Sequence, residues 1–190
     1  FEITIRDLEP AVRRWGKDMV IAENPFPDPK SIGVNGNPNF IREVIETLDI
    51  GFLLDVSHAR LTARKLEMNE FAYLMQLPLE RTKEMHVTGI KTLEGELLEK
   101  LMSNQPKSFD ISDFIGKEMD HQSLSEDDFS FLERVFGLIE EGIMQEPWVA
   151  SMEHGGIGSF WELSMDETVL AEQLPRLYNM THSINVKELV

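Results

Sequence analysis

The most constraining feature of this sequence is the even spacing of short apolar runs that each end near a polar residue. The runs 19–22, 51–54, 82–87 and 148–152 are followed by or contain Glu23, Asp55, His86 and Glu153. Amphipathic segments with helical spacing lie between them. Strands that alternate with helices predict βαβ units on a parallel sheet, and a repeat of about 30 residues is typical of a (β/α)8 barrel.

The length of the chain predicts that this barrel is incomplete. The 190 residues hold about six units of this period, so we expect an α/β TIM barrel whose N-terminal βα units lie outside the chain. The start at Phe1 in place of Met agrees with this expectation. Since no linker or low-complexity segment interrupts the pattern, residues 1–190 are expected to form a single domain, the C-terminal part of the barrel.

Local patterns predict several further elements. Residues 1–5 alternate like a strand, and the Pro- and Asn-rich stretch 24–39 predicts a long irregular loop that borders the site. Ser125 and Asp128 form an acidic variant of the capping box at the start of a helix. A last helix is expected from about Asp166, and its predicted inward residues are Val169, Leu170, Leu174 and Leu177.

Composition excludes several classes of function. The chain has 18 Lys and Arg against 34 Asp and Glu, a net charge of −16, which argues against nucleic acid and anionic membranes as partners. The absence of Cys excludes disulfides and thiolate metal sites. No apolar run approaches the roughly 18 residues of a membrane helix. We therefore expect a cytoplasmic protein whose ligand is a cation, a neutral solute or a basic peptide.

The expected strand ends carry residues of the types that commonly bind metals in proteins. In parallel sheets the carboxyl ends of the strands meet on one face, so their side chains are expected to converge. Carboxylates and imidazoles are the ligands that iron, manganese or zinc take where thiolates are lacking. His58 follows Asp55 by three residues, and His121 lies one period after His86. The predicted metal ligands are Glu23, Asp55, His58, His86, His121 and Glu153, whereas His154 and His182 are expected to point elsewhere.

Ordinary structural roles also explain each of these residues singly. Asp55 can cap the following helix, Glu23 can pair with a basic side chain, and a lone His86 on a strand is commonly a hydrogen-bonded core residue. The common period favours a shared site over separate coincidences. The glycine-rich stretch 155–158 lacks the pattern of a phosphate loop and predicts a loop only. Because spacing places no base near Ser57, a serine hydrolase is not supported.

Four sequence blocks together resemble the MNIO family, the multinuclear non-haem iron-dependent oxidative enzymes of the xylose-isomerase-like TIM barrel superfamily. The blocks are residues 21–26, 51–60, 77–89 and 152–156. The resemblance covers nearly the whole chain and corresponds to the C-terminal half to two-thirds of a family barrel. It implies a cluster of two or three iron ions at the carboxyl face. Better-studied members modify cysteine-containing precursor peptides together with a partner protein.

The resemblance also implies a role for each predicted ligand. Glu23 resembles the bridging glutamate, Asp55 the aspartate of the next strand, and Glu153 the last carboxylate. His86 resembles the strand histidine, and His58 stands where family members carry Asn or His. His121 resembles the histidine of an Asp-x-His pair, although Met119 occupies the Asp position and Asp120 is adjacent. Two early histidines of the family belong to a region that this chain does not contain.

The sequence therefore leads to one main hypothesis and two alternatives. The main hypothesis is an iron- and O2-dependent enzyme that oxidatively modifies a peptide or small molecule, with a partner protein or a homodimer as a further expectation. Manganese or zinc are alternative metals. The first alternative function is a sugar isomerase or epimerase that uses one divalent ion. The second is a non-catalytic, truncated barrel.

Overall fold

The computed structural model of the protein describes residues 1–28, 30, 32–104, 112–155 and 167–185. The chain divides into two compact units. The first consists of Phe1–Val87 and Glu141–Ser151, and the second of Thr88–Glu140 and Met152–Val190. The prediction of one domain over the whole chain stays a prediction.

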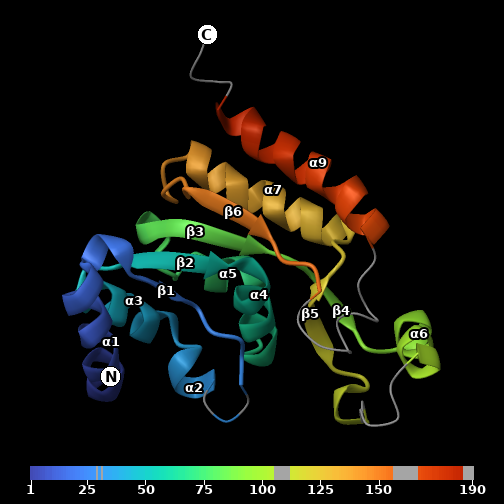
Figure 1. Cartoon of the computed structure of the whole chain (residues 1–190), viewed down its shortest axis with the longest axis horizontal. Coiled ribbons are helices and arrows are strands. Elements are labelled where there is room, and N and C mark those ends of the chain that lie inside the picture. Colours follow the sequence, from blue (N-terminus) through green and yellow to red (C-terminus); the bar gives the residue numbers. More distant parts are fainter. Residues whose placement is uncertain (29, 31, 105–111, 156–166, 186–190) are drawn as a thin grey trace. The chain divides into compact units, whose positions relative to one another are not determined.

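The first unit contains a parallel sheet in which the four strands expected from the sequence are neighbours. The strand order is β1-β2-β3-β6, and β2 pairs in parallel with both β1 and β3 (Figure 1). The strands are β1 (Ile21–Glu23), β2 (Gly51–Asp55), β3 (Thr82–Val87) and β6 (Val149–Met152). The helices of this unit are α1 (Glu2–Trp15), α2 (Ile32–Asn35), α3 (Pro38–Leu48), α4 (Val56–Lys65) and α5 (Glu70–Leu74), with short 3-10 turns at Lys17–Met19 and Leu79–Arg81.

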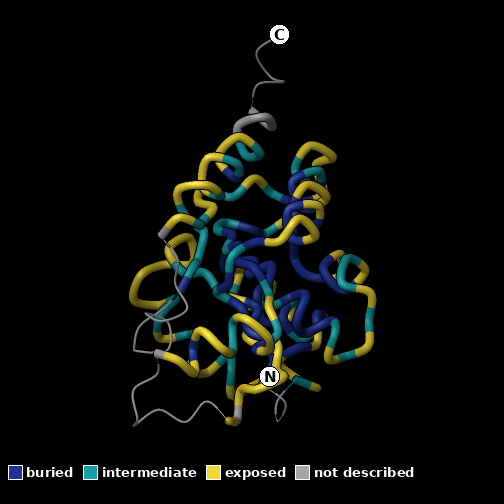
Figure 2. Tube along the Cα trace, turned by 90° about the vertical axis from the view of Figure 1, so that its right-hand side faces the viewer, coloured by how far each residue is buried: buried dark blue, intermediate teal, exposed yellow. Residues whose placement is uncertain are grey.

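The core of the first unit lies between the sheet and its helices. Strand β2 is buried along its whole length, and the burial continues through most of α4, which packs against β2 and β3 (dark blue in Figure 2). Phe52, Leu54 and Met85 are fully buried. Because side chains alternate along a strand, the intervening positions face the other side of the sheet. The register there aligns Glu23 with Leu53, Leu53 with Glu84, and Asp55 with His86.

The described residues of the second unit include a two-stranded antiparallel sheet and the helices α6, α7 and α9. The elements are β4 (Gly89–Thr92), α6 (Gly95–Asn104), β5 (Glu118–Gln122), α7 (Glu126–Glu140) and α9 (Glu167–Asn185), with a 3-10 turn at Ser112–Phe114. Leu93, Leu101 and Met119 form a small core beside α6. The capping box is confirmed, because the Asp128 carboxylate accepts from the Ser125 N–H at 2.7 Å and the Ser125 hydroxyl accepts from the Asp128 N–H at 3.2 Å.

Three local predictions are wrong. Residues 2–5 belong to helix α1 and not to a strand, because Ile5, Leu8 and Val12 continue the apolar spacing at helical intervals and are partly buried. The stretch 24–39 contains helix α2 and the start of α3. Leu174 is exposed, although α9 begins close to where it was expected. Residues 156–158 of the glycine-rich stretch lie outside the described residues.

The barrel prediction is confirmed only as an α/β fold with a parallel sheet. The four strands that end near the predicted ligands do lie side by side. The spacing from His86 to His121 does not mark a further unit of the parallel sheet. His121 lies on β5, which pairs antiparallel with β4 in a separate sheet. Within the part of the chain that the structure describes, the parallel sheet has four strands, so a complete barrel stays a prediction.

Candidate metal site

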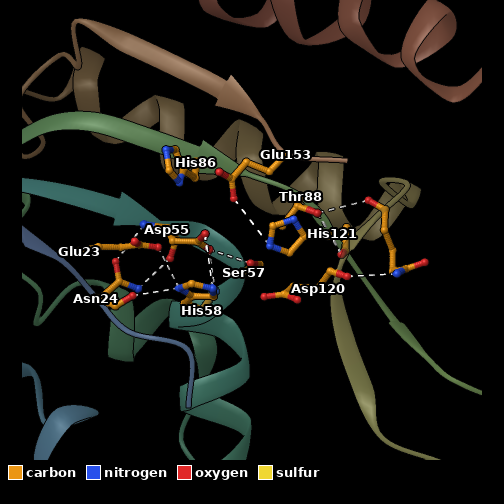
Figure 3. Close-up of polar contacts among 12 residues, drawn as sticks. Glu23, Asn24, Asp55, Ser57, His58, His86, Thr88, Asp120, His121 and Glu153 are labelled. Carbon is orange, nitrogen blue, oxygen red and sulfur yellow. Dashed lines mark hydrogen bonds and ion pairs between the residues drawn. The ribbon is translucent and has the colours of Figure 1, made fainter. Parts of the chain in front are cut away.

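Three predicted ligands meet at the carboxyl ends of neighbouring strands in the first unit. Glu23 ends β1, Asp55 ends β2, and His86 is paired with Asp55 near the end of β3 (Figure 3). One ligand atom from each of the three side chains lies within 4.8 Å of the others. Ligands at roughly 2.0–2.2 Å from one ion lie up to about 4 Å apart, so small side-chain adjustments bring all three onto a single cation.

The environment of Asp55 fits a metal ligand. Its Oδ1 atom accepts hydrogen bonds from the Ser57 hydroxyl at 2.7 Å and from the His58 backbone N–H at 2.8 Å. Its Oδ2 atom is buried and has no hydrogen-bond partner among the described residues. Burial raises the pKa of the Asp55 carboxyl, and the nearby His58 only partly offsets this. A buried carboxylate oxygen without a donor is unfavourable unless a cation compensates it.

His58 lies between the two carboxylates. Its Nδ1 atom donates to the backbone oxygen of Asn24 at 3.0 Å and is 3.2 Å from Glu23 Oε1. In the neutral ring this hydrogen bond places the lone pair on Nε2, which is 3.7 Å from Asp55 Oδ2. At this separation, Nε2 of His58 and Oδ2 of Asp55 can both bind the same ion. The arrangement is compatible with the prediction of His58 as a ligand.

Sequence reasoning missed the contribution of Asn24. This buried side chain donates from Nδ2 to the Asp55 backbone oxygen at 2.8 Å and accepts at Oδ1 from the Asp55 N–H at 2.9 Å. It thereby extends the pairing of β1 with β2 beyond the last residue of β1. The sequence signal that could have revealed this is an Asn directly after the predicted ligand Glu23. At the end of a strand, a side-chain amide can take the place of a backbone hydrogen-bond partner.

Sequence reasoning also missed the contacts that Ser57 and Glu84 make with predicted ligands. Ser57 was considered only as a nucleophile, whereas its hydroxyl donates to Asp55. The carboxylate of Glu84 lies 3.2 Å from His86 Nε2. Glu84 precedes His86 by two residues, and this spacing on a strand places both side chains on one face.

The other two predicted ligands form a pair within the second unit. His121 Nε2 lies 3.8 Å from Glu153 Oε2 (Figure 3). His121 adopts a backbone φ of 55°, a conformation that is uncommon outside glycine, and its carbonyl accepts from the Gly155 N–H at 2.9 Å. Neighbouring Met119 is part of the small core beside α6. Their role as metal ligands, and their membership of one site with Glu23, stay predictions.

One family model matches part of the chain. The family model of RiPP precursor modification enzymes MbnB/TglH/ChrH matches residues 35–105. Over these residues the match confirms the resemblance to the MNIO family, whereas the blocks 21–26 and 152–156 lie outside it. The matched residues include Asp55, His58 and His86, and they extend from just before α3 to just after α6.

The other comparisons add no relative. No curated protein and no solved structure matches the chain. Within the described residues, no helix combines the length and the apolar character needed to cross a membrane.

Proposed function

We propose that this protein is a metal-dependent enzyme of the MNIO type that oxidatively modifies a precursor peptide with iron and O2. The observation that carries the proposal is the convergence of Glu23, Asp55 and His86, with ligand atoms within 4.8 Å of one another. The family match supports the peptide substrate and the metal dependence. The parallel sheet agrees with a TIM-barrel scaffold, whose active sites lie at the carboxyl ends of the strands.

The structure suggests how each residue would hold the ion. Asp55 would bind through Oδ2 alone, because Oδ1 is already used by Ser57 and by the backbone of His58. The Glu23 side chain is 39% exposed, which leaves its carboxylate accessible from the solvent side. His58 would bind through Nε2 while its Nδ1–H holds the ring against Asn24. When bound, iron supplies the redox chemistry with O2 that none of these side chains can perform.

The protein's own residues keep the site ordered before an ion binds. Asn24 fixes the backbone at Asp55, and Ser57 fixes the rotation of its carboxylate. Pre-ordered ligands lose little conformational freedom on binding, which favours affinity. His121 and Glu153 are proposed as further ligands of the enzyme and belong in the same set of substitutions.

Metal titration of the anaerobically purified protein tests the proposal. We expect Fe(II) to bind at near-stoichiometric level to the wild type and far more weakly to His86→Ala, as measured by calorimetry and elemental analysis. Glu43→Ala, an exposed acid on α3, is the matched control and should bind as the wild type does. Absence of binding of iron, manganese and zinc to the wild type would contradict the metal site.

Oxygen consumption separates the oxidative function from the isomerase alternative. The Fe(II)-loaded wild type should take up O2 in an oxygen electrode, and His86→Ala should not. Stoichiometric metal binding with no O2 uptake would reject the oxidative reaction while leaving a divalent-ion enzyme in place.

A further inference from the structure

Glu84 is an acidic residue beside the predicted ligand His86 and is not itself one of the predicted ligands. Its Oε1 atom lies 3.2 Å from His86 Nε2, and the two side chains are 30% and 15% exposed. The register of β2 with β3 places Glu84 opposite Leu53 and His86 opposite Asp55. Glu84 is therefore level with Glu23 and two residues nearer the amino end of β3 than His86, on the same face of the sheet as His86.

We propose that Glu84 is a positioning residue for His86. The carboxylate accepts a hydrogen bond from the Nε2–H of His86, so the proton of the neutral ring stays on Nε2 and Nδ1 presents its lone pair to the ion. This inference rests on the proposed function, because it assigns the liganding nitrogen of the same site. A ligating histidine almost always donates its other N–H to such a partner, which fixes both the tautomer and the ring orientation.

The geometry favours this role over direct ligation by Glu84. The converging group contains Glu23, Asp55 and His86 but not Glu84. The register sets Glu84 level with Glu23, roughly 6.6 Å behind Asp55 and His86 along the strands, yet only Glu23 contributes an atom to the converging group. From this position the Glu84 carboxylate contacts the ring of His86 at Nε2 and can hold its orientation.

Cobalt titration measures the effect without any enzymatic turnover. Co(II) serves as the probe because its visible absorption reports the number and type of ligands. We expect Glu84→Ala to weaken Co(II) affinity about 10- to 100-fold and to change the absorption spectrum. Glu84→Gln retains an acceptor oxygen and should stay within about threefold of the wild type, while Glu43→Ala should match it.

A double-mutant cycle tests whether Glu84 acts through His86. If it does, adding Glu84→Ala to His86→Ala should change the affinity less than about twofold. An equal loss in both backgrounds would show that Glu84 ligates the metal itself and would overturn the inference. No loss in Glu84→Ala would overturn it as well.

The tautomer of the metal-free protein gives a readout that is independent of metal binding. Nitrogen-15 NMR of the His86 ring should show the Nε2–H tautomer in the wild type and in Glu84→Gln, and a mixture in Glu84→Ala. If the wild type binds no metal, the proposed function fails while this measurement still decides the role of Glu84. A wild-type ring protonated at Nδ1 alone would reject the inference.

Discussion

In the first unit, acidic side chains at the amino ends of the parallel strands have different partners from those at the carboxyl ends. At the amino ends, Asp49 precedes β2 and is bound by Lys17 and by Arg81, the latter at 2.7 Å. Glu80, which precedes β3, is bound by Arg42. At the carboxyl ends, no Lys or Arg side chain contacts Asp55 among the described residues; its neighbours are Ser57 and His58.

The pKa values of the two aspartates diverge accordingly. Hydrogen bonds from Lys17 and Arg81 hold the pKa of the Asp49 carboxyl below its ordinary value. Burial raises the pKa of the Asp55 carboxyl above that value. The chain thus supplies its own cations at one end of the strands and leaves a buried acid without one at the other. This difference supports the proposed cation site at the carboxyl end.

Exchanging the two aspartates for asparagine gives the largest expected effect. Asp55→Asn should weaken Fe(II) affinity by about 100-fold or more, because it removes a charged ligand and not merely a supporting partner. Asn caps a helix as well as Asp does, so α4 should keep its start. Asp49→Asn should leave the affinity unchanged in the same calorimetric titration. Equal effects of the two substitutions would remove the distinction between the two ends.

The metal-free stability of Asp55→Asn should move in the opposite direction. A folded-state pKa that is raised for an acid means that ionisation destabilises the fold. This cost grows as pH rises from the ordinary value of 3.8 through the raised folded-state pKa and is constant above it. At pH 7 the variant should therefore be at least as stable as the wild type in urea unfolding without metal. A clear loss of stability would show that the charge is already compensated in the metal-free protein.

Asn24→Ala should have the next largest effect, on the stability of the fold rather than on the charge of the metal site. The substitution leaves the backbone N–H and C=O of Asp55 without their side-chain partners in a buried position. Each such loss costs about 1–3 kcal/mol, so we expect the free energy of unfolding to fall by about 2 kcal/mol or more. Asn39→Ala, an exposed change on α3, is the control. Unfolding in urea measures both, and equal stabilities would contradict the proposed support.

Ser57→Ala should have a moderate effect that is confined to the carboxyl end. The hydroxyl fixes one oxygen of Asp55, and its loss frees the carboxylate to rotate. We expect about a tenfold loss of Fe(II) affinity, the lower end of the range for residues that orient a ligand. Ser57→Thr retains the hydroxyl and should recover most of the affinity. If the alanine variant binds as the wild type does, Asp55 does not need this partner.

The fold and site were predictable from the sequence wherever the signal was local. The strands β1, β2, β3 and β6 are short apolar runs, and their end residues follow directly, so Glu23, Asp55 and His86 could be expected to converge. The roles of Asn24 and Ser57 were not predictable in this way. The hydrogen bonds of Asn24 join residues 31 positions apart, and they depend on the register of two strands.

Other errors arose where a short pattern fits two structures. Five alternating residues at the start of the chain agree with a strand, but they also begin the longer helical spacing of α1. Strand β4 follows β3 after one residue and carries no separate apolar run. Its antiparallel partner β5 was therefore counted as one more parallel unit, and His121 with it.

Asp49→Asn should have the smallest effect, on the dependence of stability on pH. Because the pKa of Asp49 is lowered by its hydrogen bonds to Lys17 and Arg81, the ionised carboxylate stabilises the folded state above the ordinary value of 3.8. This contribution is lost as pH falls through the lower folded-state pKa. The ion pairs are exposed, so the wild type should exceed the variant only slightly at pH 7, and less in high salt. Urea unfolding between pH 7 and pH 3 measures the difference, which should shrink below about pH 4. A difference that grows on acidification would mean that Asp49 is not held ionised by its cations, and the contrast with Asp55 would lose its basis.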